Sequence, residues 1–139
     1  MTFVKENWPW IAAFALIAFI LLKGPISTAM AGIKTISVND LNAMMSSDQP
    51  PLLIDVRTPA EYNAGHAPKA VLIPLSEVER AIPRIQKLAG ERPIALICRS
   101  GNRSGQAAVI LSGAKLTNEI VNVGGGTMAW QSAGYAVER

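Results

Sequence analysis

The sequence predicts an α/β domain in which a parallel sheet of about five strands is covered by helices on both faces. Short apolar runs alternate with helix-forming segments along the chain, a rhythm typical of parallel sheets. The run from Pro93 to Ile97 is apolar without alternation, as expected of a strand that is buried on both faces. The 139 residues, half of them hydrophobic, are enough for one such domain with its own core.

Each strand is predicted from a short apolar run that is bounded by turn residues. The runs are residues 34–36, 52–56, 71–73, 93–97 and 119–123. In sheets of this class the functional site lies at the carboxyl ends of the strands. We therefore expect Asp55, Cys98 and Gly124 at one edge of the sheet.

Helices are predicted between the strands, largely from their capping residues. They cover residues 38–45, 59–64, 76–88, 104–112 and 127–132. Ser37 caps the first, and Thr58 with Glu61 forms a capping box at the second, because each side chain can bond the other's backbone N–H. The third is expected to be interrupted at Pro83, since proline removes a helical hydrogen bond.

The only cysteine, Cys98, is predicted where the fourth strand gives way to a helix. The loop that follows consists of Arg99, Ser100, Gly101, Asn102, Arg103 and Ser104. Its residues are small, polar or flexible, so their backbone N–H groups can point at one centre, as in an anion-binding nest. The helix dipole and two arginines should then hold the pKa of Cys98 below the ~8.5 of a free cysteine. The alternative is an inert, buried cysteine, and the polar neighbours favour the nucleophile.

The segment Cys98-Arg99-Ser100-Gly101-Asn102-Arg103-Ser104 resembles the active-site loop of the single-domain rhodaneses, which are sulfurtransferases. Four other segments resemble that family too, in the expected order. They are Asp55-Val56-Arg57-Thr58-Pro59-Ala60-Glu61-Tyr62, Gly65-His66-Ala67-Pro68, Ile73-Pro74-Leu75 and Gly125-Gly126-Thr127-Met128-Ala129-Trp130. The resemblance spans about residues 34–137 and implies a rhodanese-like fold. One departure is Lys69, where the family usually has glycine.

The resemblance implies that Cys98 takes a sulfane sulfur from a donor such as thiosulfate and holds it as a persulfide. A thiophilic acceptor, cyanide or a thiol, would then remove the sulfur. Arg99 and Arg103 are the candidates for attracting the anionic donor, while Ser100 and Asn102 shape the loop. The resemblance also implies that Asp55 steadies this loop through hydrogen bonds.

Residues outside the loop are predicted to be structural. A buried carboxylate needs a partner, so Asp55 is expected to pair with Arg57. The sole histidine, His66, follows a helix-ending glycine and is expected to bond the backbone of that turn rather than to act in catalysis. The Cys, His and carboxylate residues lack metal-ligand spacing, so neither a metal nor another cofactor is expected.

Two other functions stay open at this point. Cys98 and Arg103 form a C-x4-R pattern, one residue shorter than the C-x5-R loop of tyrosine phosphatases. A phosphatase or an arsenate reductase could use the same thiolate, although a smaller ring suits one sulfur better than a phosphate. The other alternative is a membrane-tethered persulfide carrier or docking module that acts only on a protein partner.

Residues 1–31 are predicted to be separate from the domain of residues 32–139. Residues 8–22 form an uncharged apolar run and are predicted to meet a membrane as a hydrophobic helix, although a spanning helix usually needs ~20 residues. A retained anchor with the domain on the cytoplasmic side is favoured, and a cleaved signal peptide with a periplasmic domain is the alternative. The net charge of +3 is too small and too scattered for nucleic-acid binding.

Overall fold

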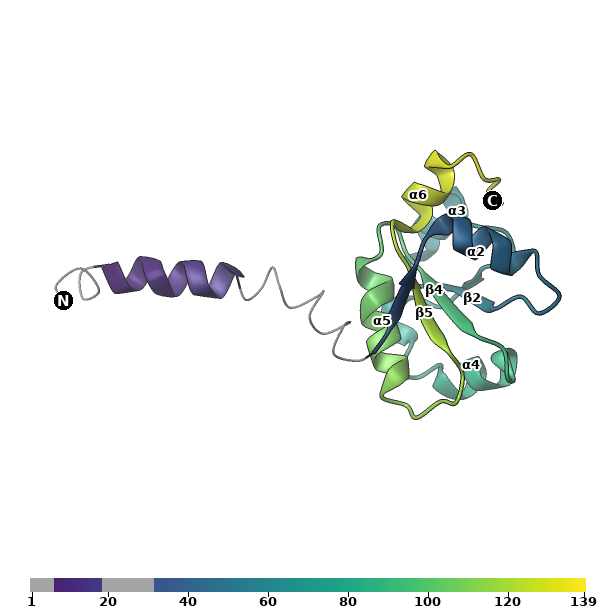
Figure 1. Ribbon diagram of the computed structural model, residues 1–139, viewed down its shortest axis with the longest axis horizontal. Coiled ribbons are helices and arrows are strands. Elements are labelled where there is room, and N and C mark those ends of the chain that lie inside the picture. Colours follow the sequence, from purple (N-terminus) through teal and green to yellow (C-terminus); the bar gives the residue numbers. More distant parts are fainter. Residues whose placement is uncertain (1–6, 19–31) are drawn as a thin grey trace.

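The computed structural model describes residues 7–18 and 32–139. Residues 32–139 build an α/β domain around one five-stranded sheet, with helices on both faces (Figure 1). All neighbouring strands are parallel. The predicted fold class is therefore confirmed for the domain.

The elements follow the predicted alternation along the chain. The strands are β1 (Lys34–Ile36), β2 (Leu52–Asp55), β3 (Val71–Leu72), β4 (Ile94–Ile97) and β5 (Ile120–Val123). The helices are α2 (Val38–Met45), α3 (Pro59–Ala64), α4 (Ile82–Ala89), α5 (Asn102–Ser112) and α6 (Gly126–Ser132), with a 3-10 turn over Leu75–Glu77. The capping box between Thr58 and Glu61 is present at the start of α3.

The strand order is β1-β5-β4-β2-β3, which places β4 at the centre. After β2 the chain enters α3 on one face of the sheet, whereas after β4 it enters α5 on the other. The loops that follow β2 and β4 therefore diverge at the carboxyl edge. A crevice at such a switch point is where sheets of this class bind their ligands.

Two hydrophobic cores lie on the two faces of the sheet. Leu52 and Ile54 point to the core that α4 and α5 cover, while Leu53 points to the core covered by α2, α3 and α6. Figure 1 shows α5 and α2 on opposite sides of β4 and β5. Since side chains alternate along a strand, burial of every residue in β2 and β4 needs both layers.

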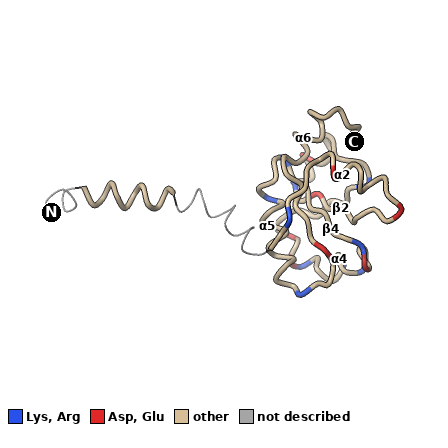
Figure 2. Tube along the Cα trace, in the orientation of Figure 1, with Lys and Arg blue, Asp and Glu red and all other residues tan. Residues whose placement is uncertain are grey.

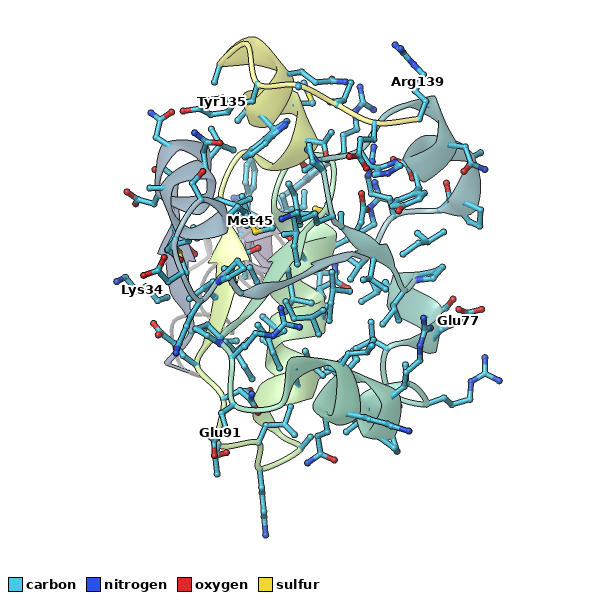
Figure 3. All side chains as sticks on the ribbon, turned by 90° about the vertical axis from the view of Figure 1, so that its right-hand side faces the viewer. Lys34, Met45, Glu77, Glu91, Tyr135 and Arg139 are labelled. Atoms are coloured by element: carbon cyan, nitrogen blue, oxygen red, sulfur yellow. The ribbon has the colours of Figure 1, made fainter. Side chains whose placement is uncertain are left out.

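The C-terminal tail returns to the carboxyl edge of the sheet and pairs with His66. The backbones of His66 and Glu138 exchange hydrogen bonds of 2.9 and 2.8 Å. Nδ1 of His66 lies 2.8 Å from the carbonyl oxygen of Tyr62, and the two rings stack, so this histidine bonds the turn as predicted. Figure 3 shows Tyr135 and Arg139 at one end of the domain, with Glu91, which precedes β4, at the other.

The helix predicted over residues 76–88 is divided in the structure. Leu75–Glu77 is a 3-10 turn, and α4 begins only at Ile82. Pro83 lies in the first turn of α4, where its missing N–H has no helical partner to lose. The proline therefore starts a helix and does not interrupt one. Lys69 adopts a left-handed φ of 66°, a conformation that glycine takes without strain.

The predicted membrane localisation is contradicted. Within residues 7–18 and 32–139, no helix is both long enough and apolar enough to cross a bilayer. Residues 7–18 are helical and carry no charged residue (Figure 2). Residues 19–22 of the predicted apolar run, and residues 23–31 that follow it, lie outside the described residues.

Candidate active site

Cys98 is the first residue after β4 and begins the loop that leads into α5. Its neighbour Ile97 lies beside Asp55, the last residue of β2. Cys98 is only 1% exposed and forms no disulfide. The structure thus places the sulfur at the carboxyl edge of the sheet, beside the switch point.

The sulfur of Cys98 is surrounded by hydrogen-bond donors. The N–H of Gly101 donates to Sγ over 3.1 Å, and Oγ of Ser104 lies 3.3 Å from Sγ. Gly101 has a φ of 105°, a backbone conformation that side chains disfavour. This conformation turns the chain from the loop into α5, and the N–H of Gly101 points back at the sulfur as the predicted nest requires.

The pKa of Cys98 is lowered, although its burial acts in the opposite direction. Burial raises the pKa because it disfavours the charged form. Hydrogen bonding by the Ser104 hydroxyl and by the backbone N–H groups of Ser104, Gly101 and Ser100 outweighs that effect. The thiolate is thus stabilised mainly by the loop's own donors and less by Arg99 and Arg103, which were predicted to have that role.

Helix α6 holds the loop through the carbonyl groups of Cys98 and Arg99. The backbone N–H and the hydroxyl of Thr127 donate to the carbonyl of Cys98 over 2.8 and 3.0 Å, and the N–H of Met128 donates to the carbonyl of Arg99. Gly126 makes this approach possible, because a Cβ there would overlap the carbonyl oxygen of Cys98 and lie 2.6 Å from the carbonyl carbon of Arg99. The start of α6 therefore fixes the loop through the main chain of Cys98 and Arg99.

Arg103 does not project freely into the site. Its guanidinium group forms a bidentate ion pair with Glu61 of α3, over 2.7 and 2.8 Å. Glu61 also accepts a hydrogen bond from the hydroxyl of Thr58, so the capping box and the ion pair share one carboxylate. The predicted role of Arg103 in attracting a donor anion is therefore weakened, since Glu61 compensates its charge.

The Glu61–Arg103 pair predicts a loss of stability in acid. Hydrogen bonds from Arg103 lower the pKa of Glu61 to about 2, from an ordinary value of 4.5. Because the folded carboxylate resists protonation, its contribution is complete above about pH 5 and is lost as the pH falls towards 2. Since both side chains are about a third exposed, we expect the ion pair to contribute about 1–2 kcal/mol to the free energy of unfolding at neutral pH. In urea unfolding at several pH values, the free energy of unfolding should fall less steeply between about pH 5 and pH 2 for Glu61→Gln than for wild type. This dependence is called the acid slope.

A matched variant makes the acid measurement specific. Glu79 is exposed, and Glu79→Gln should keep the wild-type acid slope. If Glu61→Gln and Glu79→Gln reduce the acid slope by the same amount, the Glu61–Arg103 ion pair is not the cause of that slope.

Asp55 and Arg57 form the buried ion pair that the sequence predicts. Nε and one terminal nitrogen of Arg57 donate to the carboxylate over 2.8–3.1 Å, and the backbone N–H of Arg57 also donates to it. The guanidinium group further donates to the carbonyl of Gly65. Among the described residues, the side-chain hydrogen bonds of Asp55 all go to Arg57, so direct hydrogen bonding to the cysteine loop is not observed.

A cavity of about 320 Å³ lies beside the loop, between α3 and α6. It is lined by Arg57, Glu61, Ala64, Gly65, Arg99, Thr127, Met128 and Gln131. Arg99 is exposed and Met128 is half exposed, so a cation and an apolar side chain border the cavity. Ser100 and Asn102 are also exposed.

Three residues that hold the loop were not among the predicted site residues. Glu61 was assigned to a helix cap and Thr127 to a short helix, and both lie in segments that resemble the family. Asn122 lies on β5 and contacts both Ser104 and Gly101. Its polar side chain within an apolar strand was the available indication, because a buried amide needs partners. Within the described residues, no group of three or more His, Cys, Asp and Glu side chains could hold a metal ion.

Comparison with known proteins identifies the family. The rhodanese-like domain model matches residues 37–133. A protein named sulfurtransferase from Allochromatium vinosum is 31% identical over 106 residues, which are 76% of this chain and 94% of that protein. The adenylyltransferase and sulfurtransferase MOCS3 of Sus scrofa is 34% identical over 111 residues, 68% of this chain but only 24% of that protein.

A solved structure shows the same fold. The rhodanese-related protein of Thermoplasma volcanium superimposes with a TM-score of 0.63 at 31% identity, covering 76% of this chain and 97% of that one. The match to the family model, over residues 37–133, includes the cysteine loop, both helical layers and every strand of the sheet except β1. The chain therefore belongs to the rhodanese-like family of sulfurtransferases.

Proposed function

We propose that the protein moves a sulfane sulfur from a donor such as thiosulfate to a thiophilic acceptor through a persulfide on Cys98. The functional unit in this proposal is residues 32–139. The observation that carries it is the set of donors around Sγ, from Gly101, Ser100 and Ser104. These donors stabilise a sulfur anion without a general base.

In the first half-reaction the thiolate of Cys98 attacks the outer sulfur of thiosulfate. A new S–S bond forms to Sγ, the S–S bond of thiosulfate breaks, and its electron pair leaves with sulfite. The negative charge moves to the terminal sulfur of the persulfide. Backbone N–H groups of the loop can stabilise that charge as an oxyanion hole stabilises oxygen.

In the second half-reaction an acceptor attacks the terminal sulfur. Cyanide bonds to that sulfur and departs as thiocyanate, or a thiolate bonds to it and departs as a persulfide. The Sγ–S bond breaks, and its electron pair stays on Sγ, which regenerates the thiolate. Arg99 borders the cavity beside the loop, where its cation would favour an anionic donor or acceptor.

Intact mass spectrometry of the full chain after thiosulfate treatment tests the proposal. The protein should gain the mass of one sulfur atom per chain, and cyanide should remove it while thiocyanate is released. Protein whose thiol has first been alkylated with iodoacetamide is the control and should gain none. Absence of the added mass from the unmodified protein would contradict the proposal.

A carrier that delivers its persulfide only to a protein partner is the second candidate. Met128 is half exposed beside the cavity, which suits contact with a protein surface. The MOCS3 relatives, whose name joins adenylyltransferase and sulfurtransferase, also support sulfur delivery within a larger system. Under this alternative the protein would load sulfur from thiosulfate but transfer it slowly to cyanide and small thiols.

A phosphatase or arsenate reductase is the third candidate, since the same thiolate could attack phosphorus or arsenic. Its loop would have to enclose a tetrahedral oxyanion within C-x4-R spacing. Moreover, Arg103, the arginine that this pattern supplies, is bound to Glu61. Hydrolysis of an aryl phosphate without sulfur loading would favour this candidate.

A further inference from the structure

The sulfur of Cys98 is one member of a closed ring of hydrogen-bonding groups, which also includes Gly101, Asn122 and Ser104. The N–H of Gly101 donates to Sγ of Cys98 over 3.1 Å, and the carbonyl of the same glycine accepts from Nδ2 of Asn122 over 3.2 Å. Oδ1 of Asn122 lies 2.6 Å from Oγ of Ser104, and that oxygen lies 3.3 Å from Sγ. Because the three side chains are buried, they depend on one another for hydrogen bonds.

The hydroxyl of Ser104 has one proton and two neighbours that can accept it. While the sulfur is a thiol, its S–H can donate to Oγ, and the hydroxyl then donates to Oδ1 of Asn122. Every side chain of the ring is satisfied in that state. A thiolate has no proton to give and is stabilised by each further donor, so a hydroxyl that turns to Sγ adds to the N–H groups of the loop. That turn leaves Oδ1 of Asn122 without its donor in a buried place.

Rotation of the Asn122 amide does not remove this conflict. It would bring Oδ1 against the carbonyl oxygen of Gly101, so that two acceptors faced each other. The bond from Nδ2 to Gly101 therefore fixes the amide with Oδ1 towards Ser104. Oδ1 of Asn122 and the thiolate of Cys98 therefore compete for the hydrogen bond that the Ser104 hydroxyl can donate.

We propose that Asn122 is a positioning residue of the sulfur site. Its Oδ1 accepts the hydrogen bond of the Ser104 hydroxyl while Sγ is uncharged, and the hydroxyl donates to Sγ instead when the sulfur ionises. In the proposed reaction Sγ is also uncharged in the persulfide, because the terminal sulfur carries the charge. The exchange then favours the sulfur-loaded form over the free thiolate. This consequence rests on the proposed function, whereas the proton exchange can be measured without any sulfur transfer.

The test is a titration of the Cys98 thiol in full-length Asn122→Leu, followed by the ultraviolet absorbance of the thiolate. Leucine has a similar size but offers no acceptor, so Ser104 can donate to the sulfur without a competitor. The thiol pKa should fall by about half a unit to one unit, which is the effect of about one hydrogen bond. If Asn122 merely braced the loop, its loss would leave the pKa unchanged or raise it, and either result would overturn the proposal.

Asn118 provides a matched control. Its side chain donates to the carbonyls of Gly90 and Arg92, away from the sulfur. Asn118→Leu removes the same chemical group and should leave the thiol pKa at its wild-type value. An equal fall in Asn118→Leu would show that the effect is not specific to the ring.

A double-mutant cycle asks whether Asn122 acts through Ser104. In a Ser104→Ala background, Asn122→Leu should no longer lower the thiol pKa, since no proton is left to compete for. A full-sized fall in that background would overturn the proposal. If Asn122→Leu does not fold, Asn122→Val, which suits a strand, replaces it in both measurements.

The charged groups around the sulfur are the same in all these variants. They are Arg99 in the loop, Arg103 with Glu61 from α3, and Asp55 with Arg57 after β2. A change in the thiol pKa can therefore be assigned to the hydrogen-bond ring. The expected pKa shift without any persulfide formation would count against the proposed function and leave the role of Asn122 intact.

Discussion

Replacing Cys98 with serine is expected to lower the transfer of sulfur from thiosulfate to cyanide by about 10³-fold or more. A serine hydroxyl is hardly ionised at neutral pH and is a poor nucleophile, so it cannot hold the transferred sulfur. The loop donors from Gly101 and Ser104 would remain, but they would have no sulfur anion to stabilise. The measurement is the initial rate of thiocyanate formation.

A displaced thiol provides the control for this variant. Ser112 is exposed at the end of α5, and adding Ser112→Cys to Cys98→Ser restores a cysteine without the loop. This double variant should remain as inactive as Cys98→Ser, with unchanged circular dichroism. Recovery of most of the activity would mean that any exposed thiol suffices and that the loop has no catalytic role.

Asp55→Ala is expected to lower the free energy of unfolding by about 3–5 kcal/mol, because it leaves the buried Arg57 guanidinium without its carboxylate. Asp55 is fully buried and Arg57 nearly so, so water cannot replace the lost partner. Urea unfolding followed by circular dichroism measures the change. For a domain with about 5–15 kcal/mol in total, the variant could be partly unfolded without denaturant.

Two further variants make the Asp55 result specific. Asp48 is exposed in the turn before β2, and Asp48→Ala should change stability by no more than about 0.5 kcal/mol. Adding Arg57→Leu to Asp55→Ala should recover part of the loss, since the unpaired charge is removed. A double variant that is much less stable than Asp55→Ala would show that the charge of Arg57 is not the cause.

The central part of the fold could be predicted because its sequence patterns are local. β2 and β4 are continuous apolar runs, and Thr58 with Glu61 marks the start of α3 within four residues. Pro83 was misinterpreted because a proline fits a helix start as well as an interruption. The surrounding residues did not distinguish these two possibilities.

The site could be predicted only as far as the loop itself. Cys98 to Ser104 are adjacent in sequence, so the nest of donors follows from a short segment. The contacts that hold this loop span 42 residues between Glu61 and Arg103, and 18 between Ser104 and Asn122. Such partners depend on which strands are neighbours, and the strand order is not written in any local pattern.

The contact at Gly126 bears on how substrates reach the sulfur. Since α6 is pressed against the main chain of Cys98 and Arg99 with no room for a methyl group, the loop cannot open by backbone movement without lifting that helix. Under the proposed function, a donor or acceptor would then enter past side chains that can change rotamer, and Arg99 and Met128, which border the cavity beside the loop, are the candidates. Variants designed for bulkier acceptors should therefore change Arg99 or Met128 and keep Gly126.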